Sequence, residues 1–176
     1  MSVLQLLPIG GVDGSVLADL RSGLSAAFGT RCEILPTTLD AEFAFHPERQ
    51  QYHSTEILSR MRSCLGSDCW RLLGVTSVDL YIPILTFVFG EAQINNGCAV
   101  VSLHRLRQEF HGLPADPAVL RERLLKEALH ELGHTLGLTH CGDYRCAMAA
   151  SHAVEWIDIK ESAFCGDCWA RILAAR

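Results

Sequence analysis

The chain lacks any long apolar run, any excess of basic residues and any repeated or low-complexity segment. Without a run of about 18 apolar residues, no segment is a candidate transmembrane helix. The net charge of −5 argues against a nucleic-acid-binding surface, because such surfaces are usually basic. The N-terminus has no positive segment before its short apolar stretch, so we expect no signal peptide. We therefore expect a cytoplasmic protein that binds neither membranes nor nucleic acids.

Apolar side chains are abundant, at 49% of residues, whereas charged residues make up only 20%. This balance excludes a disordered chain, which would be poorer in apolar residues. A folded chain of this size has a surface of roughly 8,500 Å², about 30% of its unfolded area, so a core can form without disulfides. We expect one domain spanning 1–176, with an N-terminal part at 1–137, a C-terminal part at 138–176, and a monomeric state.

Apolar runs alternate along the chain with helical patterns, which predicts an α/β or α+β fold. Strands are predicted at 3–7, 31–35, 70–82, 87–89 and 98–102, and helices at 13–28, at about 54–64 and at 117–136. The last helix is the clearest, because Asp116 is a good N-cap, Pro117 suits the first helical position, and Gly137 ends the apolar stripe.

This helix contains His130 and His134, four residues apart and therefore on one helix face, where they can bind one Zn²⁺. Gly137 allows a sharp turn that brings His140 back as a third nitrogen ligand. Three neutral ligands leave one position for water, as in a catalytic zinc site. Such a water has its pKa lowered to about 7, and Glu131 lies where it can accept the proton.

The main alternative for this segment is a surface helix with solvated histidines. A bare HExxH pattern arises by chance in many helices. The longer pattern HExxHxxGxxH is far more specific, and it is the known signature of metzincin metallopeptidases. The solvated-helix alternative does not explain why the helix ends where a third histidine can return.

Four of the eight cysteines are clustered near the C-terminus as a CxxxxC pair and a CxxC pair: Cys141, Cys146, Cys165 and Cys168. Two thiolate pairs separated by a loop are typical of a closed, tetrahedral, structural zinc site. We expect this metal to clip the C-terminal segment against the loop after His140, and so to fix the direction of His140. Two disulfides or ordinary buried thiols are the alternatives, and a reducing cytosol disfavours the disulfides. The remaining cysteines, Cys32, Cys64, Cys69 and Cys98, are expected to be reduced and mostly buried.

From His130 to Cys168 the sequence resembles the archaemetzincins, whose motif is HExxHxxGx₃Cx₄CxM followed by CxxC. The matching positions are His130, Glu131, His134, Gly137, Cys141, Cys146, Met148, Cys165 and Cys168. The segments 74–81 and 87–92 also resemble upstream segments of that family. Sixteen residues separate Met148 from Cys165, one fewer than in the family motif, so only the length of this loop departs from the pattern.

The resemblance implies a metzincin-like fold: a twisted, mostly parallel sheet with an antiparallel edge strand at 87–92, two or three helices, and the zinc helix beneath that strand. It also implies that Met148 forms an apolar Met-turn under the histidines. The implied activity is zinc-dependent hydrolysis of peptide bonds, with two zinc ions per chain and a peptide or protein substrate pairing with the edge strand. A non-catalytic or narrowly specific peptide-binding module is the alternative, and a zinc-ribbon nucleic-acid binder is the weakest hypothesis.

Other polar residues carry weaker signals. Tyr144 is either an oxyanion donor or, more simply, a loop tyrosine. Glu127 is either a partner of a ligand histidine or part of a solvated helix face, and Asp79 is a weak candidate for orienting a ligand. The remaining histidines have no ligand spacing and are expected at the surface or at caps: His46, His53, His104, His111 and His152.

Overall fold

The computed structural model describes residues 3–94 and 96–175; Met1, Ser2, Asn95 and Arg176 lie outside the described residues. The strands are β1 (Val3–Ile9), β2 (Cys32–Ile34), β3 (Phe45–His46), β4 (Gln51–His53), β5 (Cys69–Thr76), β6 (Leu80–Tyr81), β7 (Gly90–Ala92) and β8 (Cys98–Ser102). The α-helices are α1 (Gly14–Phe28), α2 (Ser54–Met61), α3 (Pro117–Thr135), α4 (Val154–Ile159) and α5 (Gly166–Ala174). Short 3₁₀ helices are η1 (Glu42–Ala44), η2 (Arg62–Cys64) and η3 (Gln108–His111).

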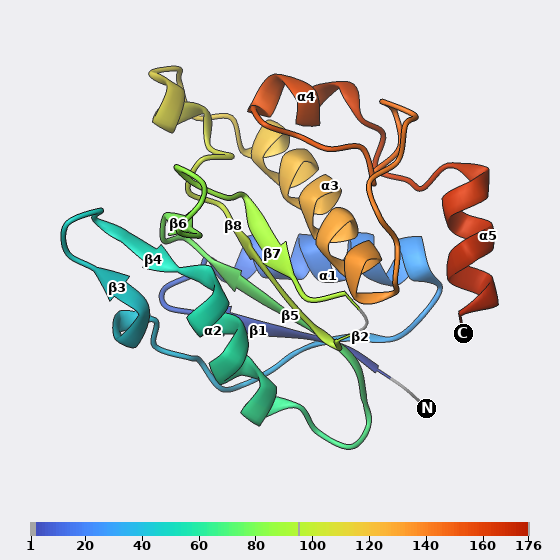
Figure 1. Ribbon diagram of the computed structural model, residues 1–176, viewed down its shortest axis with the longest axis horizontal. Coiled ribbons are helices and arrows are strands. Elements are labelled where there is room, and N and C mark those ends of the chain that lie inside the picture. Colours follow the sequence, from blue (N-terminus) through green and yellow to red (C-terminus); the bar gives the residue numbers. More distant parts are fainter. Residues whose placement is uncertain (1–2, 95, 176) are drawn as a thin grey trace.

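The main sheet has five strands in the order β2-β1-β5-β8-β7 (Figure 1). Its neighbouring strands are parallel except at one edge, where β7 runs antiparallel to β8 with Gly90 opposite Val101. The predicted α/β class and the antiparallel edge strand are therefore confirmed. The prediction of a strand at 87–89 is wrong: β7 covers only Gly90–Ala92, the end of the expected 87–92 segment, and Val88 forms only an isolated bridge with Leu80.

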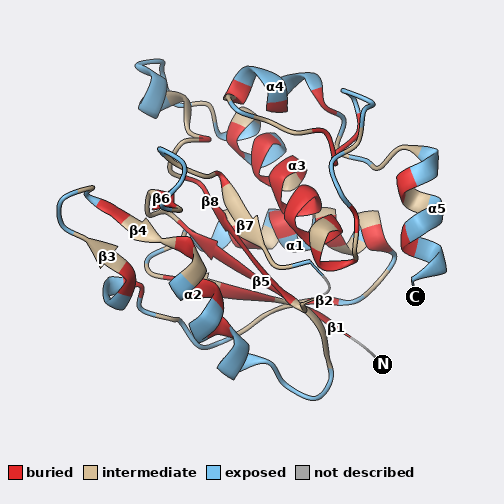
Figure 2. Ribbon diagram, viewed as in Figure 1, coloured by how far each residue is buried: buried red, intermediate tan, exposed pale blue. Residues whose placement is uncertain are grey.

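Helices cover both faces of this sheet, and the core strands are correspondingly buried (Figure 2). All five residues of β8 are buried, as expected for a parallel strand with helices on each side. One apolar cluster joins α1 and α3 to one face through residues such as Leu73 and Val101, and a second joins α2 to the other through Leu72 and Val100. The accessible surface of 8488 Å² agrees with the area expected for a compact chain of this length.

The prediction of one strand over 70–82 is wrong. β5 ends at Thr76, and β6 belongs to a separate three-stranded sheet with the order β3-β4-β6. Asp79 lies between β5 and β6, where it binds Arg105 through two bonds of 2.8 Å and Gln51 through one of 3.0 Å. Strands of two or three residues are too short to show a periodicity in the sequence, which is why this second sheet was not predicted.

Five α-helices form within the described residues, more than the two or three implied by the family resemblance. The additional ones are the short helices α4 and α5, which belong to the C-terminal segment that passes along α3 (Figure 1). None of the helices in the described ranges is both long and apolar enough to cross a bilayer.

Helix α3 follows the prediction closely. The Asp116 side chain accepts hydrogen bonds from the backbone N–H groups of Ala118 and Val119 at 3.0 and 3.1 Å, and Pro117 opens the helix. The helix ends one residue earlier than predicted, and Gly137 follows with a φ of 86°. Only glycine adopts this left-handed conformation without strain, so the turn after the helix depends on it.

Candidate active site and metal centres

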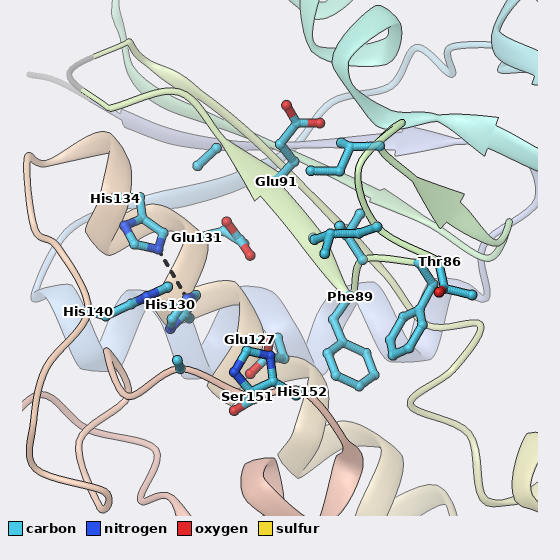
Figure 3. A pocket seen from close by; sticks show the side chains of 17 residues that line it. Thr86, Phe89, Glu91, Glu127, His130, Glu131, His134, His140, Ser151 and His152 are labelled. Atoms are coloured by element: carbon cyan, nitrogen blue, oxygen red, sulfur yellow. Dashed lines mark hydrogen bonds between the residues drawn. The ribbon is translucent and has the colours of Figure 1, made fainter.

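The turn after α3 brings three histidines together. His130 and His134 lie one helical turn apart on α3, and His140 returns from the loop after Gly137 (Figure 3). One ring nitrogen from each histidine lies within 4.8 Å of the others. His130 is buried, whereas His140 is exposed, so the cluster has one side open to solvent.

Backbone carbonyls decide which ring nitrogens carry protons. Nδ1 of His130 lies 2.8 Å from the carbonyl oxygen of Ala147, and Nδ1 of His134 lies 2.8 Å from that of Leu138. A carbonyl oxygen only accepts hydrogen bonds, so both Nδ1 atoms donate and each neutral ring keeps a bare Nε2. These two Nε2 atoms face each other at 3.1 Å.

Burial keeps these rings neutral. It is the main cause that lowers the pKa of His130 to about 3, and it also lowers the pKa values of His134 and His140. Two unprotonated nitrogens facing each other have no hydrogen to share, but they suit a cation. Zn–N bonds of 2.0–2.1 Å in a tetrahedron place ligand nitrogens about 3.3 Å apart. The three side chains therefore fit a zinc ion.

Glu131 is buried beside this cluster, on the side that faces β7 (Figure 3). Burial raises its pKa well above the usual carboxylic value, and the nearby carboxylates of Glu127 and Glu91 add to that rise. Gly90 of β7 makes room for it, because a Cβ at this position would stand 2.6 Å from the Val100 carbonyl oxygen and 2.9 Å from Oε1 of Glu131. The edge strand and the carboxyl group thus approach each other at a glycine.

A cleft of about 480 Å³ runs between the edge strand and α3. One wall is mostly apolar and consists of the loop before β7 and β7 itself, with Thr86 and Glu91 as its polar members. The opposite wall carries the three histidines with the segment Ala150–His152. His152, expected only as a surface histidine, is exposed, but it lies in this wall (Figure 3). The sequence held one signal for this position: His152 follows Met148 by four residues, and Met148 is expected directly under the histidines.

Met148, which lies beneath the histidines, explains why the HExxH pattern contains a glycine at Gly133. Met148 is fully buried, and a Cβ on Gly133 would stand only 2.3 Å from its sulfur. Gly133 lies on α3 between the two ligand histidines, so the methionine packs against the helix backbone at that point. This is the apolar floor that the family resemblance implies.

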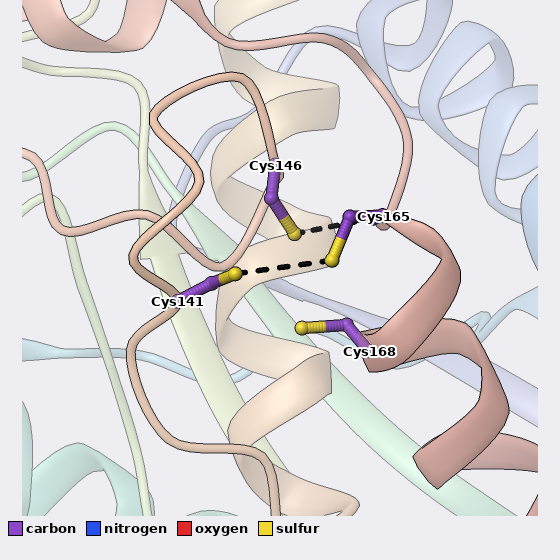
Figure 4. A group of neighbouring side chains, drawn as sticks. All are labelled: Cys141, Cys146, Cys165 and Cys168. Carbon is purple, nitrogen blue, oxygen red and sulfur yellow. Dashed lines mark hydrogen bonds between the residues drawn. The ribbon is translucent and has the colours of Figure 1, made fainter.

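The four clustered cysteines also converge (Figure 4). Their sulfurs lie within 4.8 Å of one another, and the Sγ atoms of Cys141 and Cys165 are 3.8 Å apart. A disulfide requires about 2.05 Å, whereas four sulfurs at 2.3 Å from a zinc ion are about 3.8 Å apart. The geometry therefore favours a metal site over disulfides.

Backbone amides donate hydrogen bonds to the cysteine sulfurs of this cluster. The N–H groups of Asp143, Met148 and Cys165 donate to cysteine sulfurs at 3.3 to 3.4 Å. A hydrogen bond from the backbone of Cys168 is the main cause that lowers the pKa of the Cys165 thiol, and burial raises the pKa of Cys146. These residues fit a closed site for zinc with four sulfur ligands.

The two clusters share one stretch of chain. His140 directly precedes Cys141, and the Cys141 N–H donates to the carbonyl oxygen of Met148 at 2.9 Å. The sulfur cluster is thus joined to the floor under the histidines. This contact supports the prediction that the cysteine site controls the direction of His140, which remains a prediction.

The structure decides between the alternatives for three weaker signals. Tyr144 is 64% exposed and does not line the cleft, as expected for a simple loop tyrosine and not for an oxyanion donor. Glu127 does not belong to a solvated helix face: it is buried, with Lys160 3.2 Å away. Asp79 pairs with Arg105 away from the histidines. Sequence reasoning overlooked Lys160 entirely, because an isolated lysine carries no motif.

The four other cysteines are free thiols. Cys32 and Cys98 are buried in strands, as predicted. Cys69 is only partly buried and Cys64 is exposed, so the expectation of burial is wrong for Cys64.

Comparison with known proteins agrees with this geometry. The model of the family described as Peptidase family M54 matches residues 27–174. The chain belongs to this peptidase family. The archaemetzincin of Methanocaldococcus jannaschii is 42% identical, with 94% of this chain and 89% of the relative covered; that of Pyrococcus abyssi is 38% identical, with 98% and 95% covered. The resemblance to archaemetzincins is therefore confirmed.

Solved structures show that this M54 member shares the fold of its relatives. A crystal structure of archaemetzincin from Archaeoglobus fulgidus, complexed with malonate, matches with a TM-score of 0.83 at 36% identity, covering 97% of this chain and 99% of the other. A zinc-dependent peptidase from Methanocorpusculum labreanum matches with a TM-score of 0.86 at 31% identity, covering 96% and 99%.

Proposed function

We propose that this zinc metallopeptidase of family M54 binds two zinc ions per chain. His130, His134 and His140 would hold the catalytic ion, and Cys141, Cys146, Cys165 and Cys168 would hold the structural one. The observation that carries the proposal is the pair of bare Nε2 atoms 3.1 Å apart, in the same cleft as Glu131 and the edge strand.

When bound, the zinc would supply a Lewis acid that polarises the scissile carbonyl and makes water more acidic. Glu131 is the proton carrier in this proposal. It lies in the same cleft as the three histidines, where it can take up a proton from the attacking water. The same carboxyl group then returns that proton to the leaving amine, so one residue acts first as base and then as acid.

The substrate in this proposal is an extended peptide or protein segment. β7 is the last strand of the sheet, so β8 occupies only one of its edges, and residues 88–92 line the cleft. An extended peptide can add to such an edge through backbone hydrogen bonds. This would place a peptide carbonyl between the strand and the histidines, beside Glu131. Residues 1–176 as a single domain, the monomeric state and a cytoplasmic location remain predictions.

Metal analysis combined with a Glu131→Gln variant tests the proposal. We expect two zinc equivalents in both proteins. We also expect the variant to cleave a peptide library about 10² to 10⁴ times more slowly, because the proton carrier is lost. Chelator-treated wild type serves as the metal-free control. A variant that cleaves as fast as wild type would show that Glu131 is not the base, and an inactive wild type that binds peptides tightly would favour a peptide-binding module.

A further inference from the structure

The cleft has a buried ion pair behind it that the proposed chemistry does not use. Lys160, directly after α4, has a side chain with 0% exposure. Its ammonium donates to Oε1 of Glu127 at 3.2 Å and to the carbonyl oxygen of Ala147 at 3.3 Å. Glu127 lies on α3, three residues before His130. A buried charge pair often contributes no more stability than apolar side chains of the same size, so its place beside a ligand histidine needs another explanation.

The Ala147 carbonyl connects this pair to the histidines. It accepts hydrogen bonds from Nδ1 of His130 and from the ammonium of Lys160, which together use its two lone pairs. The N–H of Ala147 donates to the carbonyl oxygen of Ala163 at 2.9 Å. Contacts on both sides therefore hold the peptide groups that flank Ala147.

The two α3 histidines depend on their carbonyl partners in different ways. His134 donates to Leu138, four residues further along in the turn after the helix, so its partner is positioned locally. His130 donates to Ala147, which is 17 residues away. Only tertiary contacts can hold that oxygen in place, and Lys160 supplies one of them.

We propose that Lys160, with Glu127 as its counter-ion, is a positioning residue that orients His130 for metal binding by holding the Ala147 carbonyl. This inference rests on the proposed catalytic zinc site. A hydrogen-bond partner of a ligand histidine fixes the ring orientation and the tautomer, and its loss typically weakens metal binding 10- to 100-fold. Lys160 acts one step further out, on the partner itself.

The test compares two double variants of the full chain. Lys160→Met with Glu127→Gln removes both charges, so that no unpaired charge is left buried. Arg123→Met with Asp158→Asn is the control for the loss of a more exposed ion pair between the same two segments, because Arg123 on α3 binds Asp158 of α4 through two bonds of 2.7 Å. Zinc affinity is measured by chelator competition, and stability by urea unfolding of the zinc-free proteins.

We expect the Lys160 variant to bind one of its two zinc equivalents about 10 times more weakly, the lower end of the range for losing a direct partner, and the control to bind both as wild type does. Equal affinities in the two double variants would overturn the inference. If the Lys160 double variant does not fold, Lys160→Gln replaces it. The shorter glutamine side chain cannot contact both Glu127 and Ala147, so we expect the same loss of zinc affinity. An unchanged zinc affinity in this variant would overturn the inference. Wild type without zinc at the histidines would instead overturn the proposed function.

Discussion

The two candidate metal centres differ in donor type, in access and in how they are assembled. The histidine cluster offers three neutral nitrogens, one of them on an exposed ring, and lies in a cleft beside a buried carboxyl group. The cysteine cluster offers four sulfurs, enough to complete a tetrahedron. An ion held by the first keeps a position for water, whereas an ion held by the second does not. The number of ligands, more than the identity of the metal, separates a catalytic from a structural role.

The assembly of the centres differs as well. Two of the three histidines come from one helix, and backbone carbonyls orient both rings. The cysteines come from two segments, the loop after His140 and the start of α5, which are 19 residues apart between Cys146 and Cys165. Neither site exists in the unfolded chain, so metal binding at each adds to the free energy of folding, and we expect the larger contribution from the site with four thiolates. This difference can be tested directly.

The largest effect is expected from Cys165→Ala. We expect it to remove one zinc equivalent and to lower the free energy of unfolding by about 4 kcal/mol, the contribution of a ligand present at a thousand times its dissociation constant. His134→Ala should remove the other equivalent at a smaller cost in stability. Metal analysis and urea unfolding measure both. If both variants keep two equivalents, the division into two centres is wrong.

A smaller effect is expected where the two centres meet, at Met148. Its N–H donates to the sulfur of Cys146, and its side chain packs against Gly133. Gly133→Ala should therefore lower the free energy of unfolding by about 1–3 kcal/mol, because the buried methionine has to move. Gly14→Ala is the control, since a Cβ there meets nothing within 4 Å. Urea unfolding of the zinc-loaded proteins compares the two variants. Equal stability would mean that Met148 does not pack tightly against Gly133.

The smallest effect concerns thiol reactivity without any substitution. Burial raises the pKa of Cys32 to about 12 and that of Cys98 to about 11, so both stay protonated at pH 8 and react slowly with iodoacetamide. Cys64 is exposed and should react first. Peptide mass spectrometry follows each site over time. The four clustered cysteines should become reactive only after chelation, and equal rates with and without zinc would argue against a metal there.

Sequence patterns made of neighbouring residues predicted the positions of helix α3 and strand β8 well. The cap at Asp116, the proline that follows it and the closing glycine are local signals, and they placed α3 to within one residue. The strand at 98–102 was also placed correctly, because a fully buried strand has a continuous apolar run. Prediction failed at 70–82, where one apolar run serves two different sheets.

The site shows the same limit. Ligand types and spacings were readable, since residues four apart on a helix share a face whatever surrounds them. The burial of Glu127 and its pairing with Lys160 were not readable, because 33 residues separate the two partners.

The amino-acid sequence alone therefore specified which side chains can bind metal and how many ligands each cluster offers. Both follow from residue identity and helix geometry. The folded molecule decided the rest: which rings stay neutral, which carboxyl group is buried, and which carbonyl orients His130. Those properties arise from desolvation and from hydrogen bonds between segments far apart in the chain, and no local pattern encodes them.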